Sequence, residues 1–383
     1  MTSVATPRDR LLALDVFRGA TVAAMLLVNN PGTWSASYAP LQHAPWHGWT
    51  PTDLIFPFFL FIVGITTHLS IARRREQGAG DGLLVRQIFV RGGLIIFFGL
   101  LLNAFPFYPL ERITNIRIPG VLQRIGVCYI CAALITLRTT LRQQIAIVAA
   151  LLLGYWVTMT LVPVPGQLGV GRELLDEPSA SLAAWLDRTV FGTHLWRSSR
   201  TWDPEGLLST IPAIGTTLLG VLGGYWLGRT GRPIGDRLAG LFAVGSLLMV
   251  LGLMWNWVFP INKNLWTSSY VLFTAGMGAA ALGTCIWLID VLALRRWTTP
   301  LVVFGVNPLL AFIGSGMMAR LIYSVIQVPF RGEKVPVQRV IYETGFASWL
   351  APRNASLLFA VTFVLFWVGL LWILYRRRVY LRV

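Results

Sequence analysis

Charged residues are scarce in this chain of 383 residues, of which only 13% are Asp, Glu, Lys or Arg. A soluble domain carries about 25% charged residues. Hydrophobic residues make up 55% of the chain, and its mean hydropathy is +0.64. Since no long polar segment separates the apolar runs, the sequence excludes an ordinary soluble domain and predicts a protein that is almost entirely embedded in a membrane.

Cysteine and histidine are also rare, with three and four residues respectively. Cys128 and Cys131 form a C-x-x-C pair inside an apolar run, which favours buried packing over redox chemistry or a disulfide framework. The four histidines are too dispersed for a zinc site, because His68 falls about a membrane thickness from His43 along the predicted helix. We therefore expect no metal cofactor.

The net charge of +16 comes from 32 Lys and Arg residues against 16 acidic residues. The basic residues form short runs beside apolar segments, as at residues 73–75, 295–296 and 376–378. This distribution is typical of cytoplasmic loops of membrane proteins and not of a basic nucleic-acid-binding face. It predicts that both termini are cytoplasmic, and it argues against a nucleic-acid partner.

About ten apolar runs are long enough to cross a bilayer, which takes roughly 20 residues each. The sequence thus predicts an all-α, polytopic membrane protein whose residues 1–383 form a single transmembrane domain. The apolar surface of each span faces either lipid or a protein partner, so a homodimer is compatible with this architecture. The predicted spans are 11–30, 54–72, 88–105, 119–137, 143–162, 207–228, 238–258, 268–289, 299–318 and 356–375.

Two long segments, about 163–206 and 319–355, are predicted on the extracytoplasmic side. Loops of this length in a compact protein are usually functional or disordered. Their tryptophans favour folded caps or interfacial anchors. The stretch from His43 to Asp53 is predicted on the same side, so we expect a functional site there.

His43, His47 and Asp53 precede the second apolar run. Prolines and a glycine in this stretch favour a loop over a helix, so the four-residue spacing of the histidines says little about their geometry. His43 is either a functional imidazole or an interfacial side chain bonded to a carbonyl. Asp53 is expected to cap the second helix, to orient an imidazole, or to do both.

Polar residues at the two ends of the first span are further candidates. Asn29 and Asn30 are explained by helix termination, and they could also donate hydrogen bonds to a polarised carbonyl. Arg18 is three residues after Asp15 near the cytoplasmic end, where we expect a local ion pair. We retain Arg18 as a candidate binding residue.

The remaining candidates lie farther along the chain. Arg124 is predicted inside a helix in its outer half, where a buried guanidinium needs an anion or carbonyl partner. Asp203 and Glu205 precede the sixth span, which suits the helix dipole and would also suit a cationic or hydroxyl-rich acceptor. Lys263 and Asn264 occupy a short outer turn, and Lys263 is one of only two lysines in the chain.

Several of these motifs together resemble the membrane acetyltransferases related to heparan-α-glucosaminide N-acetyltransferase. The matching stretches cover nearly the whole chain in the family's order. They are residues 14–19 (LDVFRG), 29–32 (NNPG), 43–46 (HAPW), 50–57 (TPTDLIFP), 118–124 (IPGVLQR), 203–206 (DPEG) and 262–268 (NKNLWTS).

The resemblance implies transfer of an acetyl group from acetyl-CoA to an amino sugar across a membrane. It assigns the active-site histidine to His43. His47 stands where the animal enzyme has Asn, so no catalytic role is carried over to it. A bacterial inner membrane is the expected location, and the acceptor could be a cell-wall or scavenged amino sugar, or another amine or hydroxyl compound.

On this hypothesis a cavity between the helices brings the thioester of acetyl-CoA toward His43. The imidazole then acts either as a general base or as an acetyl carrier. Asp53 would orient the ring, Asn29 or Asn30 would stabilise the oxyanion, and Arg124 with Lys263 would meet phosphates or the acceptor. The alternative is a transporter for a sugar or small anion, in which the same polar groups bind substrate or protons.

Overall fold

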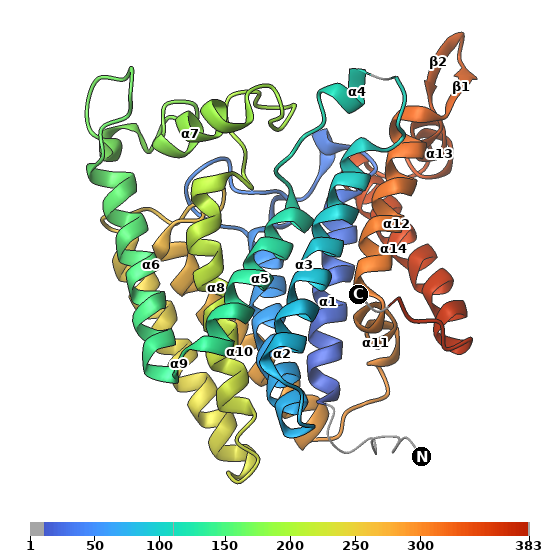
Figure 1. The fold of residues 1–383 in the computed structure, drawn as a ribbon. Coiled ribbons are helices and arrows are strands. Elements are labelled where there is room, and N and C mark those ends of the chain that lie inside the picture. Colours follow the sequence, from blue (N-terminus) through green and yellow to red (C-terminus); the bar gives the residue numbers. More distant parts are fainter. Residues whose placement is uncertain (1–10, 110, 382–383) are drawn as a thin grey trace.

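The computed structural model describes residues 11–109 and 111–381. Ten helices in this part of the chain are long and apolar enough to cross a membrane, which confirms the predicted all-α, polytopic architecture. They form one bundle (Figure 1). The ten are formed by α1 (Leu12–Asn29), α2 (Ile55–Glu76), α3 (Asp81–Ala104), α5 (Val121–Arg138), α6 (Leu141–Leu161), α8 (Leu207–Leu227), α9 (Ile234–Trp255), α10 (Ser268–Ile286), α12 (Pro308–Arg320) and α14 (Pro352–Arg376). The span of α12 continues through a π-helical turn to Val325.

The ninth span differs from the predicted continuous helix over 299–318. A short helix α11 (Thr299–Val306) ends at Asn307, and α12 begins at Pro308. The residue before a proline is pushed away from helical angles, and Asn307 accordingly has φ −128° and ψ 48°. Its side chain binds the C-terminal tail, donating to the Val379 carbonyl at 3.2 Å and accepting from the Leu381 amide at 3.0 Å.

Burial separates central from peripheral helices. At least half of each apolar span is buried in α1, α2, α5, α8 and α10, whereas less than a third is buried in α3, α9, α12 and α14. Inside the bundle, α2 packs on α8 and α10 packs on α9. The peripheral helices therefore present the apolar faces that suit contact with lipid acyl chains.

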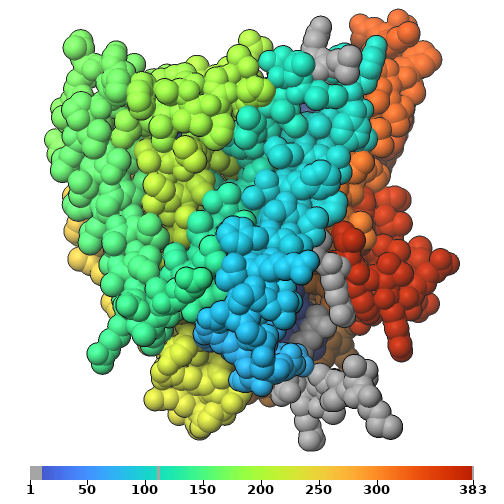
Figure 2. Space-filling model, in the orientation of Figure 1, coloured from blue at the N-terminus to red at the C-terminus, as the bar shows by residue number. Residues whose placement is uncertain are grey.

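One end of the bundle carries most of the structure outside the spans, and we call it the outer end. Here lie α7 (Leu182–Phe191), the short α4 (Glu111–Thr114) and α13 (Val337–Gly345) (Figure 1). Strands β1 (Gln327–Phe330) and β2 (Glu333–Pro336) pair antiparallel as a hairpin that the sequence analysis did not predict. In the space-filling view, the segment around α7 (green) and the hairpin (orange) cover this end (Figure 2).

The predicted topology places this outer end on the extracytoplasmic side, since α1 starts at the opposite end (Figure 1). Most of the basic runs flank helix ends remote from α7 and α13. The predicted single domain and its basic termini include residues 1–10 and 382–383. These positions lie outside the described residues. The cytoplasmic location of the termini remains a prediction.

Candidate functional site

The site begins at the entrance to α2. Thr50 precedes a 3₁₀ turn (Pro51–Leu54) that runs directly into this helix. Asp53 accepts hydrogen bonds in its Oδ2 atom from the Thr50 amide at 3.0 Å and from the Thr50 hydroxyl at 3.2 Å. The Asp53 side chain caps the helix entrance, as predicted, and it is 1% exposed.

The same carboxylate holds His43. The Nδ1 atom of His43 lies 2.6 Å from Oδ1 of Asp53, and the Ala44 amide donates to Oδ2 at 3.0 Å. Because an ionised carboxylate only accepts hydrogen bonds, Nδ1 of His43 carries a proton, and in the neutral ring the lone pair is therefore on Nε2. The His43 side chain is 47% exposed, so its ring is open to the outer surface while Asp53 behind it is buried.

Lys263 approaches His43 from the turn between α9 and α10. Its Nζ atom lies 3.1 Å from Nδ1 and 3.2 Å from Nε2 of His43, and 3.7 Å from Oδ1 of Asp53. The two loops are joined by a backbone hydrogen bond from the Gly48 amide to the Ile261 carbonyl at 2.7 Å. The structure thus brings three of the predicted site residues into contact.

The second histidine of the loop has different partners. His47 contacts Oδ1 of Asp176 through Nε2 at 2.8 Å, and its Nδ1 atom lies 3.3 Å from the side-chain nitrogen Nδ2 of Asn262. Asn262 is fully buried, and Asn264 lies two residues later in the same turn. His47 therefore belongs to the packing between loops and not to the His43–Asp53 pair.

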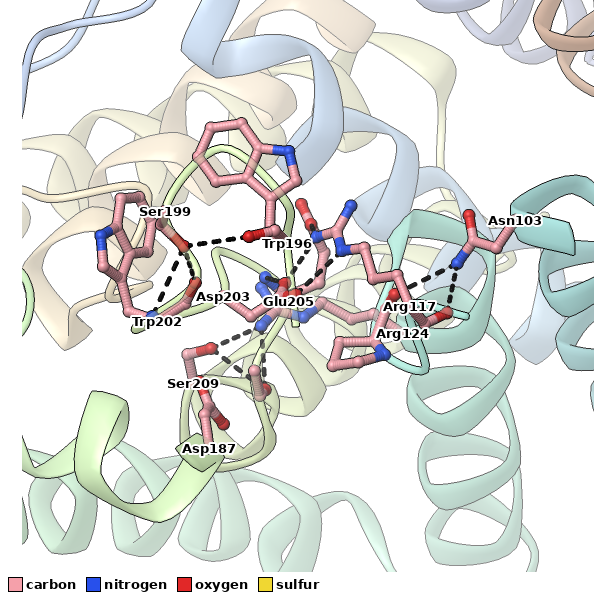
Figure 3. A network of polar contacts seen from close by, with 12 residues as sticks. Asn103, Arg117, Arg124, Asp187, Trp196, Ser199, Trp202, Asp203, Glu205 and Ser209 are labelled. Atoms are coloured by element: carbon pink, nitrogen blue, oxygen red, sulfur yellow. Dashed lines mark hydrogen bonds and ion pairs between the residues drawn. The ribbon is translucent and has the colours of Figure 1, made fainter. Parts of the chain in front are cut away.

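A second cluster joins an arginine to two acidic residues before α8. Arg117 donates from Nε to Oδ2 of Asp203 at 2.8 Å and from Nη2 to Oδ1 of Asp203 at 2.5 Å, and it also contacts Glu205 (Figure 3). Burial alone would lower the pKa of Arg117 and raise that of Glu205. Their mutual attraction prevails, so the pKa of Arg117 is raised and that of Glu205 is lowered.

Arg124 lies below this cluster, in α5, and is 2% exposed. Its Nη2 atom donates to the Gly206 carbonyl at 3.1 Å and to the Ser209 hydroxyl at 2.5 Å (Figure 3). The guanidinium carbon lies 5.1 Å from the ring centre of Trp266. Among the described residues, its Nε and Nη1 atoms have no hydrogen-bond partner. A carbonyl partner was predicted for Arg124 and is confirmed.

Glu205 and Arg124 interact electrostatically with Lys263. Burial lowers the pKa of Lys263 below its usual value, Asp53 and Glu205 act in the opposite direction, and Arg124 lowers it further. Lys263 in turn contributes to the lowered pKa of Glu205. The charged groups around Lys263 therefore respond to one another.

The other predicted residues have hydrogen-bond partners or helix positions of their own. Arg18 binds Oδ1 of Asp15 at 3.2 Å, as expected, and donates to the Gly305 carbonyl at 3.1 Å near the start of α1. Asn29 is the last residue of α1, and the Asn30 side chain donates to a carbonyl of the same helix at 2.8 Å. The two asparagines thus have the predicted helix-terminating role, and their oxyanion role remains a prediction.

Sequence reasoning missed Arg117. A usable signal was present: a basic residue on the outer side, immediately before the IPG motif of residues 118–120, opposite the acidic residues Asp203 and Glu205. Buried carboxylates need a cation or several hydrogen bonds. The large outer segment contains several arginines, so charge alone could not have selected this one.

Comparison with known proteins adds evidence that is independent of this geometry. Residues 10–252 match the family described as heparan-alpha-glucosaminide N-acetyltransferase, catalytic. The chain is 31% identical to the heparan-alpha-glucosaminide N-acetyltransferase of Homo sapiens over 354 residues, which cover 80% of this chain and 52% of that protein. It is also 31% identical to the protein of the same name from Mus musculus over 357 residues, with coverage of 80% and 53%.

The chain spans about half the length of these relatives. The match over residues 10–252 includes His43, Asp53, Arg124 and the Asp203–Glu205 pair, and Lys263 lies beyond it. Ten candidate membrane spans accompany the match, so the protein is an integral membrane protein. With the predicted resemblance confirmed, this chain belongs to the heparan-alpha-glucosaminide N-acetyltransferase family.

Proposed function

We propose that this protein is a transmembrane acetyltransferase that moves an acetyl group from acetyl-CoA to the amino group of an amino sugar at the outer end. The observation that carries the proposal is the half-exposed imidazole of His43, held at 2.6 Å by the buried carboxylate of Asp53. Family membership supports the reaction class, and the chemistry of the pair supports the choice of His43 as its base.

The reaction needs a base because a protonated amine has no lone pair for attack. On our proposal, a neutral acceptor amine attacks the thioester carbonyl and loses a proton to Nε2 of His43. The new carbon–nitrogen bond forms, the carbon–sulfur bond breaks, and the sulfur leaves with the bonding pair. The proton then passes from His43 to the thiolate. Asp53 keeps Nδ1 protonated, so that Nε2 is the accepting atom.

The donor must approach from the opposite side, because acetyl-CoA is cytosolic and does not cross a bilayer unaided. A cavity of about 300 Å³, lined by residues at the inner ends of α2, α5, α6 and α8, supports entry of the donor at that end. His68 and Arg75 are among its polar lining residues. The basic runs support a cytoplasmic orientation of that end, and we place the protein in a bacterial inner membrane.

We expect His43→Ala to lower acetyl transfer to glucosamine by about 100-fold or more, because general-base catalysis contributes on that scale. Asp53→Asn should lower it as well, since the ring would lose its orienting carboxylate. The measurement is release of CoA thiol by the purified full-length protein, with acetyl-CoA as donor. The elution profile and melting temperature of each variant show that the fold is retained.

His47→Ala is the matched control, because His47 occupies the same loop and contacts Asp176 instead of Asp53. Its turnover should stay within about threefold of the wild type. Undiminished turnover in His43→Ala would remove His43 from the mechanism. Flux of a sugar into liposomes without acetyl-CoA, together with no thiol release by the wild type, would support a transporter instead.

A further inference from the structure

Lys263 places a positive charge directly against the His43 ring, although the two residues are 220 positions apart in the sequence. We propose that Lys263 is a positioning residue that keeps the His43 imidazole in its neutral, proton-accepting form. The inference rests on the proposed role of His43 as the base. It assigns to Lys263 a task that acts through the histidine and not through contact with phosphate.

The distances define how the ammonium acts. Nζ of Lys263 is 3.1 Å from Nδ1 and 3.2 Å from Nε2 of His43, so it cannot lie in line with both ring nitrogens. Nδ1 already donates to Asp53 at 2.6 Å. Because Nδ1 donates to Asp53, Nε2 is the only ring nitrogen that can accept from the ammonium, and it lies 3.2 Å from Nζ. This contact suits the neutral ring, and an acceptor amine takes the place of the ammonium at Nε2.

Lys263 is not simply the counter-ion of Asp53. Four donors already occupy the carboxylate oxygens of Asp53: the His43 ring, the Ala44 amide, and the amide and hydroxyl of Thr50. The nearest approach of Nζ to the carboxylate is 3.7 Å, which is longer than a hydrogen bond. The closest polar atoms to Nζ are those of the imidazole.

The backbone fixes the position of Lys263. Asn262 anchors the turn: its amide donates to the Thr267 hydroxyl at 3.0 Å, and its Oδ1 atom accepts from the Leu265 amide at 2.9 Å. The Trp266 amide donates to the Lys263 carbonyl at 3.1 Å. A fixed turn orders the long lysine side chain at a lower entropic cost than a mobile one would.

Opposing charges set the balance at the ring. Asp53 and Lys263 face His43 directly, while Glu205 and Arg124 act on Lys263 from the neighbouring cluster. Asp53 favours a protonated ring and Lys263 disfavours it.

The test measures the protonation of His43 without using acetyl transfer. Diethyl pyrocarbonate acylates neutral imidazole, and mass spectrometry of the full-length protein reports the extent of modification at each histidine between pH 5 and 9. We expect Lys263→Met and Lys263→Gln to raise the pH of half-maximal His43 modification by about one unit, because the opposing charge is gone. Lys263→Arg should remain close to the wild type.

His194 serves as an internal control, because its Nδ1 atom contacts the Ile116 carbonyl at 2.7 Å and lies in another loop. A second test removes the charge of Lys263 by chemical modification of the folded protein, so that position 263 itself is not substituted. In a Lys334→Arg background Lys263 is the only lysine, so acetylation of the folded protein removes its charge while reductive methylation retains it. The acetylated protein should show the same upward shift, and the methylated protein should not.

An unchanged pH of half-maximal His43 modification after neutralisation of Lys263 would overturn the proposal. This outcome differs from failure of the proposed function, which would appear as no acetyl transfer by the wild type at any pH. Where transfer is active, the acid limb of its pH profile should shift in the same direction in Lys263→Met. A uniform loss at every pH would show that Lys263 is only structural.

Discussion

At the scale of the residue, Asp53 combines the two positions expected of it, at the helix entrance and against an imidazole. One carboxylate oxygen contacts His43, and the other receives three hydrogen bonds that close the loop onto the entrance of α2. Charge-assisted hydrogen bonds of this kind are stronger than neutral ones. The helix cap therefore supplies a rigid support for the imidazole, and a change at Asp53 affects both local structure and chemistry.

A second buried carboxylate gives a pH-dependent prediction. Asp187 in α7 accepts a hydrogen bond from the Leu207 amide at 2.9 Å, and burial raises its pKa to about 6. A pKa raised by folding favours the protonated folded state. Asp187 therefore costs the folded protein nothing below about pH 4, and it costs up to ~3 kcal/mol once the pH has risen above 6.

Asp187→Asn should remove this cost, because an amide stays neutral and can still accept from Leu207. We expect a higher apparent melting temperature than the wild type at pH 7.5 and nearly the same value at pH 4, measured by intrinsic fluorescence in detergent. Glu177→Gln, which changes an exposed carboxylate of the same outer segment, is the control. A lower melting temperature in Asp187→Asn at pH 7.5 would mean that the charge is stabilising.

At the scale of the element, the backbones of α2 and α8 approach each other closely. A Cβ atom on Gly64 would lie 1.9 Å from the Thr217 carbonyl oxygen, and one on Gly220 would lie 2.1 Å from that of Phe61. These backbones approach so closely because neither helix has a side chain at the crossing. The crossing fixes α2, which begins beyond Asp53, relative to α8, which carries Ser209 beneath Arg124.

Gly220→Ala should separate the two helices, since the new methyl group meets backbone and not a flexible side chain. Overpacking typically costs about 1–3 kcal/mol, so we expect the apparent melting temperature to fall by at least ~3 °C, with reduced acetyl transfer. Gly154→Ala on α6 is the matched control, because no atom lies within 4 Å of its added Cβ. Equal melting temperatures for the two variants would contradict this account of the crossing.

At the scale of the whole molecule, the basic runs predict which end faces the cytoplasm. Short loops rich in arginine resist translocation, and the long segments around α7 and α13 gather at the opposite end (Figure 1). This asymmetry agrees with the proposed chemistry, in which the donor arrives from the cytoplasm and the acceptor is extracytoplasmic. The asymmetric distribution of arginines and long segments does not depend on the contacts around His43.

A labelling experiment checks this orientation. After replacement of the three native cysteines, a cysteine is introduced either as Ser198→Cys in the outer segment or as Gln77→Cys after α2, both at exposed positions. We expect a membrane-impermeant maleimide to label the first variant in spheroplasts and the second only after lysis. The reverse pattern would invert the proposed topology and place His43 on the cytoplasmic side.

The features that the sequence predicted are those that depend on local information. Ten apolar runs predicted ten spans, and the turn-forming residues around His43 predicted a loop, because length and hydropathy act within a window of about 20 residues. The break at Asn307 was also local in origin. It was missed because the apolar composition on both sides of Pro308 outweighed the proline signal.

The geometry of the site could not be predicted in the same way. Contacts such as Lys263 with His43 and Arg117 with Asp203 join segments that are 220 and 86 positions apart. Such pairs are set by helix packing and not by spacing along the chain. The family resemblance assigned the active-site histidine to His43, and the place of Asp53 before the second apolar run made it a candidate. The roles of Lys263 and Arg117, by contrast, depend on which loops the bundle brings together.

The backbone hydrogen bond from Gly48 to Ile261 has a consequence for the motion of the site. Together with the His47–Asn262 and His43–Lys263 contacts it joins the loop that carries His43 to the turn that carries Lys263, so displacement of either segment pulls on the other. If the outer end opened, the His43 imidazole and the Lys263 ammonium would then move together. A substrate that displaced the two segments would still meet His43 with Lys263 beside its ring.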